Sequence, residues 1–72
     1  MATSVNAHIT GTVWKIEVAV GDAVTEGQTV IILESMKMEM PVEAPSAGKV
    51  SAVLVKEGAA VEEGAPLVEL IP

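Results

Sequence analysis

The residue best placed to do chemistry is Lys37, which lies close to the middle of the 72-residue chain between Met36 and Met38. The apolar, largely β-branched residues 29–33 precede it, and residues 40–45 also favour extended backbone. A charged residue between two strand-like runs is typical of a hairpin tip. The sequence therefore predicts a single lysine that projects into solvent from a stiff two-stranded hairpin.

The surroundings of Lys37 favour modification over catalysis. A catalytic lysine needs burial or a cationic neighbour that lowers the pKa of its amine, because only the neutral amine is nucleophilic. Lys37 instead has the carboxylates of Glu34 and Glu39 close in sequence. We therefore predict no catalytic residue in this chain, and we expect Lys37 to be the substrate of another enzyme that removes its proton and supplies an activated acyl group.

The stretch around this lysine carries a family resemblance. Glu34-Ser35-Met36-Lys37-Met38 resembles the Glu-Ala-Met-Lys-Met signature of biotin carboxyl carrier domains, with Ser35 where the family more often has alanine. The resemblance covers the chain from about residue 5 to residue 71. It implies that Lys37 carries biotin through an amide, and that the surrounding recognition motif is read by partner enzymes; this motif consists of Glu34, Ser35, Met36, Met38 and Glu39.

The same resemblance implies a carrier role without catalysis. A biotin protein ligase would attach the cofactor. A biotin carboxylase component would then load the carried ring with a carboxyl group, and a carboxyltransferase component would unload it to an acceptor. The domain would supply position and tethering, which raise the local concentration of the carried group.

Two other functions stay open at this point. Lipoyl carriers share the fold but usually place Asp-Lys-Ala at the hairpin, so Met36 and Met38 both depart from their pattern. Lipoate attached by a lipoyl-transfer enzyme, alone or alongside biotin, remains the first alternative. The second is an unmodified β-sandwich that serves only as an interaction module.

Composition excludes several classes of function. The chain has no cysteine and a single histidine, so we predict neither a disulfide framework nor a metal site. Its net charge is −6 and it lacks arginine, which argues against nucleic-acid binding. No apolar run approaches the roughly 20 residues that cross a membrane, and the first residues do not resemble a secretion signal. We expect a cytoplasmic, monomeric domain.

An internal repeat organises the sequence as one domain over residues 1–72. Shifting the chain by 37 residues aligns residues 5–35 with residues 42–72 without gaps. The alignment contains eleven identities in 31 positions, where composition alone would give roughly three. Two copies of this length predict a domain with quasi-two-fold symmetry, in which each half completes the core of the other.

Strand-like runs and turn residues predict an all-β fold. The half-apolar composition is mainly valine, alanine, isoleucine and leucine, and glycine or proline punctuates short runs. We expect strands over residues 5–8, 11–20, 23–24, 29–35, 38–44, 49–56, 59–61 and 66–71. Eight short strands predict a sandwich or flattened barrel, and the resemblance implies a barrel-sandwich hybrid of two four-stranded antiparallel sheets.

Four further residues receive assignments from their types and positions. We expect Trp14 to pack against the core, with an exposed partner contact as its alternative role. Met40 is assigned to packing, and His8 to the surface. Because Pro41 cannot donate to a strand ladder, we expect it on an edge strand or at a bulge.

Overall fold

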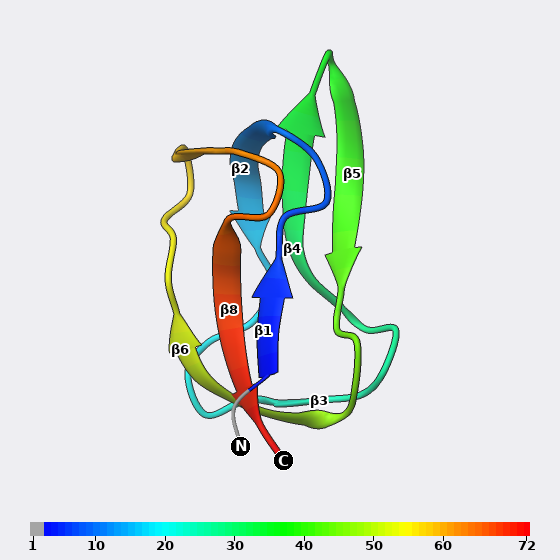
Figure 1. Cartoon of the computed structure of the whole chain (residues 1–72), viewed down its shortest axis with the longest axis vertical. Helices are drawn as coiled ribbons and strands as arrows, with labels where there is room; N and C mark the ends of the chain where they lie inside the picture. The colour runs from blue at the N-terminus through cyan, green and yellow to red at the C-terminus, as the bar shows by residue number, and fades with distance from the viewer. Residues whose placement is uncertain (1–2) are drawn as a thin grey trace.

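The computed structural model describes residues 3–72, which form two four-stranded antiparallel sheets around one core (Figure 1). The Cα atoms span 33 × 18 × 18 Å, and the long axis runs from the chain ends to the hairpin between β4 and β5. No helix in these residues is long and apolar enough to cross a membrane. The strands are β1 (Thr3–Asn6), β2 (Gly11–Ile16), β3 (Ala23–Val24), β4 (Thr29–Ser35), β5 (Met38–Glu43), β6 (Gly48–Val53), β7 (Ala60–Val61) and β8 (Pro66–Ile71).

Each sheet draws strands from both halves of the repeat. One sheet has the order β1-β8-β6-β3 and the other has the order β5-β4-β2-β7. A shift of 37 residues relates β1 to β5, β2 to β6, β3 to β7 and β4 to β8, so it exchanges the two sheets. The bulges follow the same relation, because the register shift between Val13 and Lys15 recurs between Val50 and Ala52. The predicted all-β fold with quasi-two-fold symmetry is confirmed.

Backbone hydrogen bonds outside the strand ladders tie the halves together. Fourteen such bonds among residues 3–72 form seven pairs, which differ by 37 residues in both donor and acceptor. In one set, the Ala7 amide donates to the Ala65 carbonyl (2.8 Å) and the Ala7 carbonyl accepts from the Gly64 amide (2.8 Å). Val13, Ala44 and Val50 make the same kind of two-bond exchange with the opposite half. Because an unpaired buried peptide group is costly, neither half can satisfy its backbone alone.

The core is built only from small and medium aliphatic side chains. No polar or charged side chain among the described residues is buried. β1, β5 and β6 each bury one residue, whereas β4 and β8 bury two consecutive residues, Val30 with Ile31 and Leu67 with Val68. The fifteen buried residues are Val5, Ala7, Val13, Val18, Val24, Val30, Ile31, Leu33, Val42, Ala44, Val50, Val61, Leu67, Val68 and Leu70.

The predicted long strands extend too far towards the C-terminus. The strand expected over residues 11–20 ends at Ile16, and the one expected over residues 49–56 is Gly48–Val53. Apolar alternation continues to the buried Val18, but the chain then reverses, because the Asp22 carboxylate accepts from the Ala19 amide at 2.9 Å. The first strand also differs, since it runs over Thr3–Asn6 and not over residues 5–8. Smaller differences affect the strands expected at 38–44 and 59–61, each by one residue.

The prediction that Trp14 packs into the core is wrong. The Trp14 side chain is 47% exposed, and Trp14 is the residue skipped by the register between β2 and β4. A bulge places an extra residue on one strand and interrupts simple alternation. The inward position beside it is filled by Val13, so the indole ring is left on the outer surface. Pro41 lies on β5, an edge strand, as expected.

We predict that replacing Gly11 or Gly48 by alanine will destabilise the fold to a similar extent. A Cβ atom would lie 2.6 Å from the Glu34 carbonyl oxygen at the first site and 2.6 Å from the Ile71 carbonyl oxygen at the second. Relieving either contact requires a backbone shift, so we expect a loss of about 1–3 kcal/mol in the free energy of unfolding. Urea denaturation measures it, with Lys49→Ala as an exposed control that should change stability by less than about 0.5 kcal/mol. An unchanged Gly48→Ala variant would contradict the close approach.

Candidate attachment site

The site begins with a two-residue turn between β4 and β5. Ser35 and Met38 are the last paired residues, which leaves Met36 and Lys37 to reverse the chain. Both have left-handed backbone, with φ of 52° at Met36 and 66° at Lys37. Two left-handed residues define the type I′ turn, whose twist matches that of the flanking strands. Glycine or asparagine usually occupies these positions, so the structure supports a turn that costs about 1 kcal/mol per residue.

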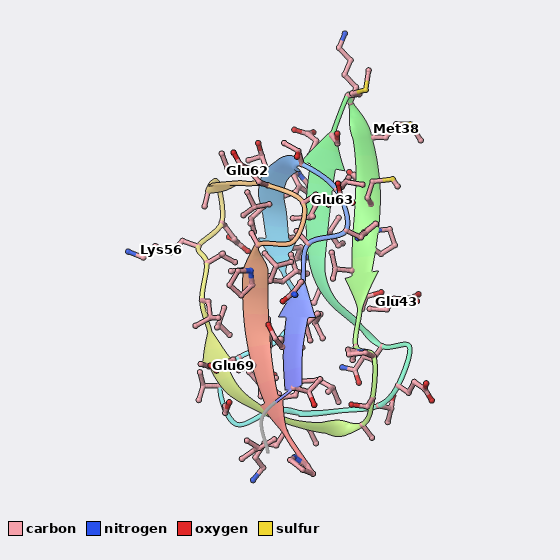
Figure 2. The ribbon with its side chains drawn as sticks, in the orientation of Figure 1. Met38, Glu43, Lys56, Glu62, Glu63 and Glu69 are labelled. Atoms are coloured by element: carbon pink, nitrogen blue, oxygen red, sulfur yellow. The ribbon has the colours of Figure 1, made fainter. Side chains whose placement is uncertain are left out.

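The hairpin holds Lys37 away from the rest of the domain. Its tip rises above the other strands, at the end opposite the chain termini (Figure 1). Lys37 is exposed, and no hydrogen bond or ion pair to its amine occurs within residues 3–72. The adjacent methionines are also exposed, Met36 by 92% and Met38 by 62%. Figure 2 shows Met38 near the free end of the hairpin. The predicted solvent-exposed lysine is thus present in the structure.

The base of the hairpin is tied on both sides. β4 lies between β5 and β2, and its pairing with β2 extends to the contact between Thr12 and Glu34. Only the Ser35–Met38 pair and the turn extend beyond that point. A tip that overhangs its sheet by one residue pair has little freedom to bend. The lysine backbone is therefore held in place while its side chain is left free.

Two carboxylates occupy the outer face of the hairpin. Glu34 and Glu39 are directly paired across β4 and β5, and both are exposed. Like charges at opposed positions repel and disfavour pairing. Within the described residues the ion pair is that of Lys15 with Glu17, at 3.6 Å, so neither Glu34 nor Glu39 has a cationic partner.

The inner face of the hairpin is apolar and overhangs a hollow. This hollow of about 220 Å³ is lined by Ile9, Ser35, Met36, Met38 and Met40. Ile9 comes from the loop between β1 and β2 and is partly buried against the core. Ile9 was not singled out from the sequence. The repeat contained a signal, since Ile9 and Met40 are apolar where the corresponding positions of the other half are the polar Ser46 and Thr3. Met40 is half-buried at the edge of this hollow.

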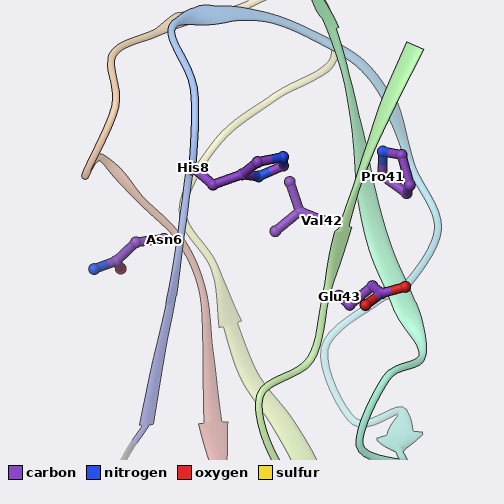
Figure 3. A pocket seen from close by; sticks show the side chains of 5 residues that line it. All are labelled: Asn6, His8, Pro41, Val42 and Glu43. Carbon is purple, nitrogen blue, oxygen red and sulfur yellow. The ribbon is translucent and has the colours of Figure 1, made fainter.

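A second hollow lies between the edge strands of the two sheets. It measures about 310 Å³ and is lined by Asn6, His8, Pro41, Val42 and Glu43. His8 and Val42 approach each other across it, whereas Asn6 and Glu43 lie lower on opposite walls (Figure 3). His8 is exposed, as expected. No group of three or more potential metal ligands occurs in residues 3–72.

These features suit the lysine to being modified. Within residues 3–72 no hydrogen bond or ion pair engages the Lys37 amine, and its neighbours Met36 and Met38 line an apolar hollow. An acylating enzyme could enclose the whole turn without displacing any interaction of the amine. The six predicted site residues, 34–39, do lie together at one end of the molecule.

Comparison with known proteins identifies the family. Residues 1–70 match the profile of the family described as "Biotin-requiring enzyme", and the chain belongs to that family. It is 48% identical over 67 residues to the biotin/lipoyl attachment protein of Bacillus subtilis, covering 93% of this chain and 92% of that protein. It is 44% identical over 69 residues to the biotin carboxyl carrier protein of Streptococcus mutans, covering 96% of this chain and 53% of that protein.

A solved structure agrees with this placement. The urea carboxylase of Kluyveromyces lactis matches 99% of this chain with a TM-score of 0.93 and 42% identity. The match takes up 6% of the carboxylase chain, so the similarity concerns one domain of a much longer protein. It supports the barrel-sandwich fold over the full described length.

We predict that Met36→Asn will stabilise the protein. Asparagine tolerates left-handed backbone better than methionine does, so the strain at φ 52° should fall. The expected gain in unfolding free energy is about 0.5 kcal/mol, measured by urea denaturation. Met38→Asn is the matched control, because Met38 is exposed but lies in the strand. An equal gain at both positions, or a loss at Met36, would argue against turn strain.

Proposed function

We propose that Lys37 is the residue through which this chain carries covalent biotin, as a non-catalytic carrier of carboxyl groups. The observation that supports this assignment is a free lysine amine at the apex of a two-residue turn whose arms are held in a ladder. Family membership supports the cofactor and the carrier role. Lys15, Lys49 and Lys56 are the other three lysines, and none of them stands at a hairpin apex.

The geometry fits the attached group. Acylation forms an amide between Nζ of Lys37 and the carboxyl carbon of biotin, and the bond from that carbon to the activating group breaks. The ammonium loses two protons, one to the attaching enzyme before the amine attacks and one as the activating group leaves. The product is neutral, and no ion pair among residues 3–72 is lost. About ten bonds then separate the Lys37 Cα from the ring, which corresponds to a reach of roughly 12–13 Å.

The carried group, when bound, supplies a nitrogen that accepts and releases a carboxyl group. The residues of this chain supply everything else. β4 and β5 fix the position of the Lys37 backbone, from which the arm extends. Met36 and Met38 place exposed apolar side chains on either side of Lys37, and we call this pair the apolar collar. Glu34 and Glu39 give one side of the hairpin a negative charge. We assign the motif of residues 34–39 to recognition by a biotin protein ligase and by the carboxylase and carboxyltransferase components that the carrier serves.

Lipoate is the second candidate group. The similarity to a protein named for both biotin and lipoyl attachment favours it, as does the short, exposed turn that any acylating enzyme could reach. A lipoyl-transfer enzyme would then be a further partner. The methionines flanking Lys37 would distinguish the two pathways, because both are exposed and directly flank it.

We predict that Lys37→Ala will abolish biotin labelling and leave the thermal midpoint nearly unchanged. The Lys37 side chain makes no contact that folding needs, and alanine meets a similar backbone cost at φ 66°. Intact mass and peptide mapping after treatment with biotin, MgATP and a biotin protein ligase measure the labelling. The control replaces Lys15, Lys49 and Lys56 with arginine and should label fully.

Two results would contradict the assignment to Lys37. Biotin found on any of the other three lysines would show that the attachment site is not Lys37. A complete absence of label on the wild-type chain, both in this assay and in protein purified from its own cells, would favour the unmodified interaction module.

We further predict that changing Met36 to Asp and Met38 to Ala shifts labelling from biotin towards lipoate. The substitutions replace the apolar collar with a charged and a small residue while keeping the exposed amine. Intact mass follows the initial rate of biotinylation by a biotin protein ligase and of lipoylation by a lipoyl-transfer enzyme. The ratio of these two rates measures the preference. An unaltered ratio in a folded variant would show that neither methionine is read.

A further inference from the structure

An apolar surface lies on the outer face of the sheet that carries the hairpin. We call it the Trp14 face and define it by Trp14, Ile32 and Pro41. Ile32 on β4 pairs with Lys15 on β2 and with Pro41 on β5, so these three positions form one row across the sheet. Ile16 beside Lys15 is partly buried against the core, and Leu33 and Val42 beside the other two positions are buried, so alternation turns the row outward. Lys15 and Pro41 are exposed, and Ile32 between them is partly exposed.

The bulge in β2 adds Trp14 to this row. The register passes from the Val13–Leu33 pair to the Lys15–Ile32 pair, so Trp14 is an extra residue beside Lys15. Two consecutive side chains, Trp14 and Lys15, consequently face solvent. The Trp14 ring is 47% exposed and is the aromatic side chain of the domain. Nothing in the core requires an aromatic residue at this position.

The quasi-two-fold symmetry provides an internal control. The positions that correspond to Trp14, Ile32 and Pro41 on the other sheet are Ser51, Glu69 and Ser4. The same bulge is present there, and the Ser51 hydroxyl donates to the Glu69 carbonyl at 3.2 Å. The fold therefore accepts polar residues at all three positions. Folding therefore does not explain why these positions are apolar on one sheet alone.

Charge identifies the kind of partner that fits. Glu34 and Glu39 stand on the same outer face, between the Trp14 face and Lys37, and among residues 3–72 neither has a cationic partner. A partner surface with an apolar pocket for the indole ring and a lysine or arginine beyond it would match both features. Tryptophan seated in such a pocket is a common source of binding energy at protein interfaces.

We propose that the Trp14 face is the docking surface for the biotin carboxylase component that acts on the group carried by Lys37. The inference rests on the function proposed above. Ile32 precedes Lys37 by five residues along β4, so the face lies roughly 15 Å behind the tip. It presents the same atoms whether the amine is free, acylated or carrying a carboxyl group. That property suits a partner that meets the carrier in every cycle, as the biotin carboxylase and carboxyltransferase components both do, whereas an attaching enzyme must read the turn itself.

The test uses Trp14→Ser, which copies the residue found at this position in the other half. Wild-type and variant carriers are fully biotinylated, verified by intact mass, and supplied to the biotin carboxylase of the source organism with MgATP and bicarbonate. We expect kcat/KM for the carrier to fall at least tenfold, mainly through KM. Leu54→Ser is the matched control, because Leu54 is also 47% exposed, and it should stay within twofold of wild type.

A second variant covers the case in which Trp14→Ser unfolds. Ile32→Glu copies Glu69 of the other sheet, and we expect it to lower kcat/KM by a similar factor. Thermal unfolding checks that each variant is folded. The rate of biotinylation by the ligase should stay within twofold of wild type for both.

Several outcomes would overturn the proposal. Wild-type kcat/KM in folded Trp14→Ser or Ile32→Glu would remove the docking role. An equal loss in Leu54→Ser would show that the effect is not specific to this face. A lower rate of biotinylation with unchanged kcat/KM for carboxylation would show that the ligase, and not the biotin carboxylase, binds the Trp14 face. A loss in the two variants that is confined to the carboxyltransferase step would assign the face to that component. Failure of the proposed function would be seen earlier and separately, as the absence of biotin on Lys37.

Discussion

The structure depends on two halves that satisfy each other's buried backbone. Ala7, Val13, Ala44 and Val50 are almost fully buried, and each exchanges two hydrogen bonds with a turn of the opposite half. A small domain without disulfides or aromatic core residues has few other sources of cooperativity. Because a peptide group loses its water on burial, these crossed hydrogen bonds make the folding of one half conditional on the other. Quasi-two-fold symmetry follows from this mutual dependence.

The same symmetry explains where the functional lysine lies. The turn at Met36 and Lys37 connects the halves at one end of the long axis, and the chain termini lie at the other (Figure 1). The turn is the position at which the sequence need not obey the repeat, so strained, exposed residues can be placed there without disturbing the core. The ladder around β4 then supports the left-handed backbone of both residues. A biotin carrier of the biotin-requiring enzyme family needs little more than this rigid origin for a mobile arm.

Much of this arrangement could be predicted from the sequence, because the repeat and the turn residues report directly on the backbone. Gly11 and Gly48 align in the repeat, and each allows a carbonyl to approach where a Cβ would clash. Features governed by register could not be predicted. Simple alternation says nothing of a bulge, so it could not place Trp14 outside, and it could not show that the strand ends at Ile16 while Val18 is still buried. The contribution of Ile9 to the hollow beside Lys37 depends on how a loop folds back, which local sequence does not specify.

The carrier function proposed for Lys37 requires that the backbone beneath it is rigid, whatever the amine carries. Backbone ¹⁵N relaxation of the unmodified and biotinylated protein measures this rigidity. We expect order parameters near 0.85 for Ser35 through Met38 in both forms, close to those of the core strands. Values below about 0.6 at the turn, or a marked change on modification, would contradict it, because the arm would then move from a flexible base.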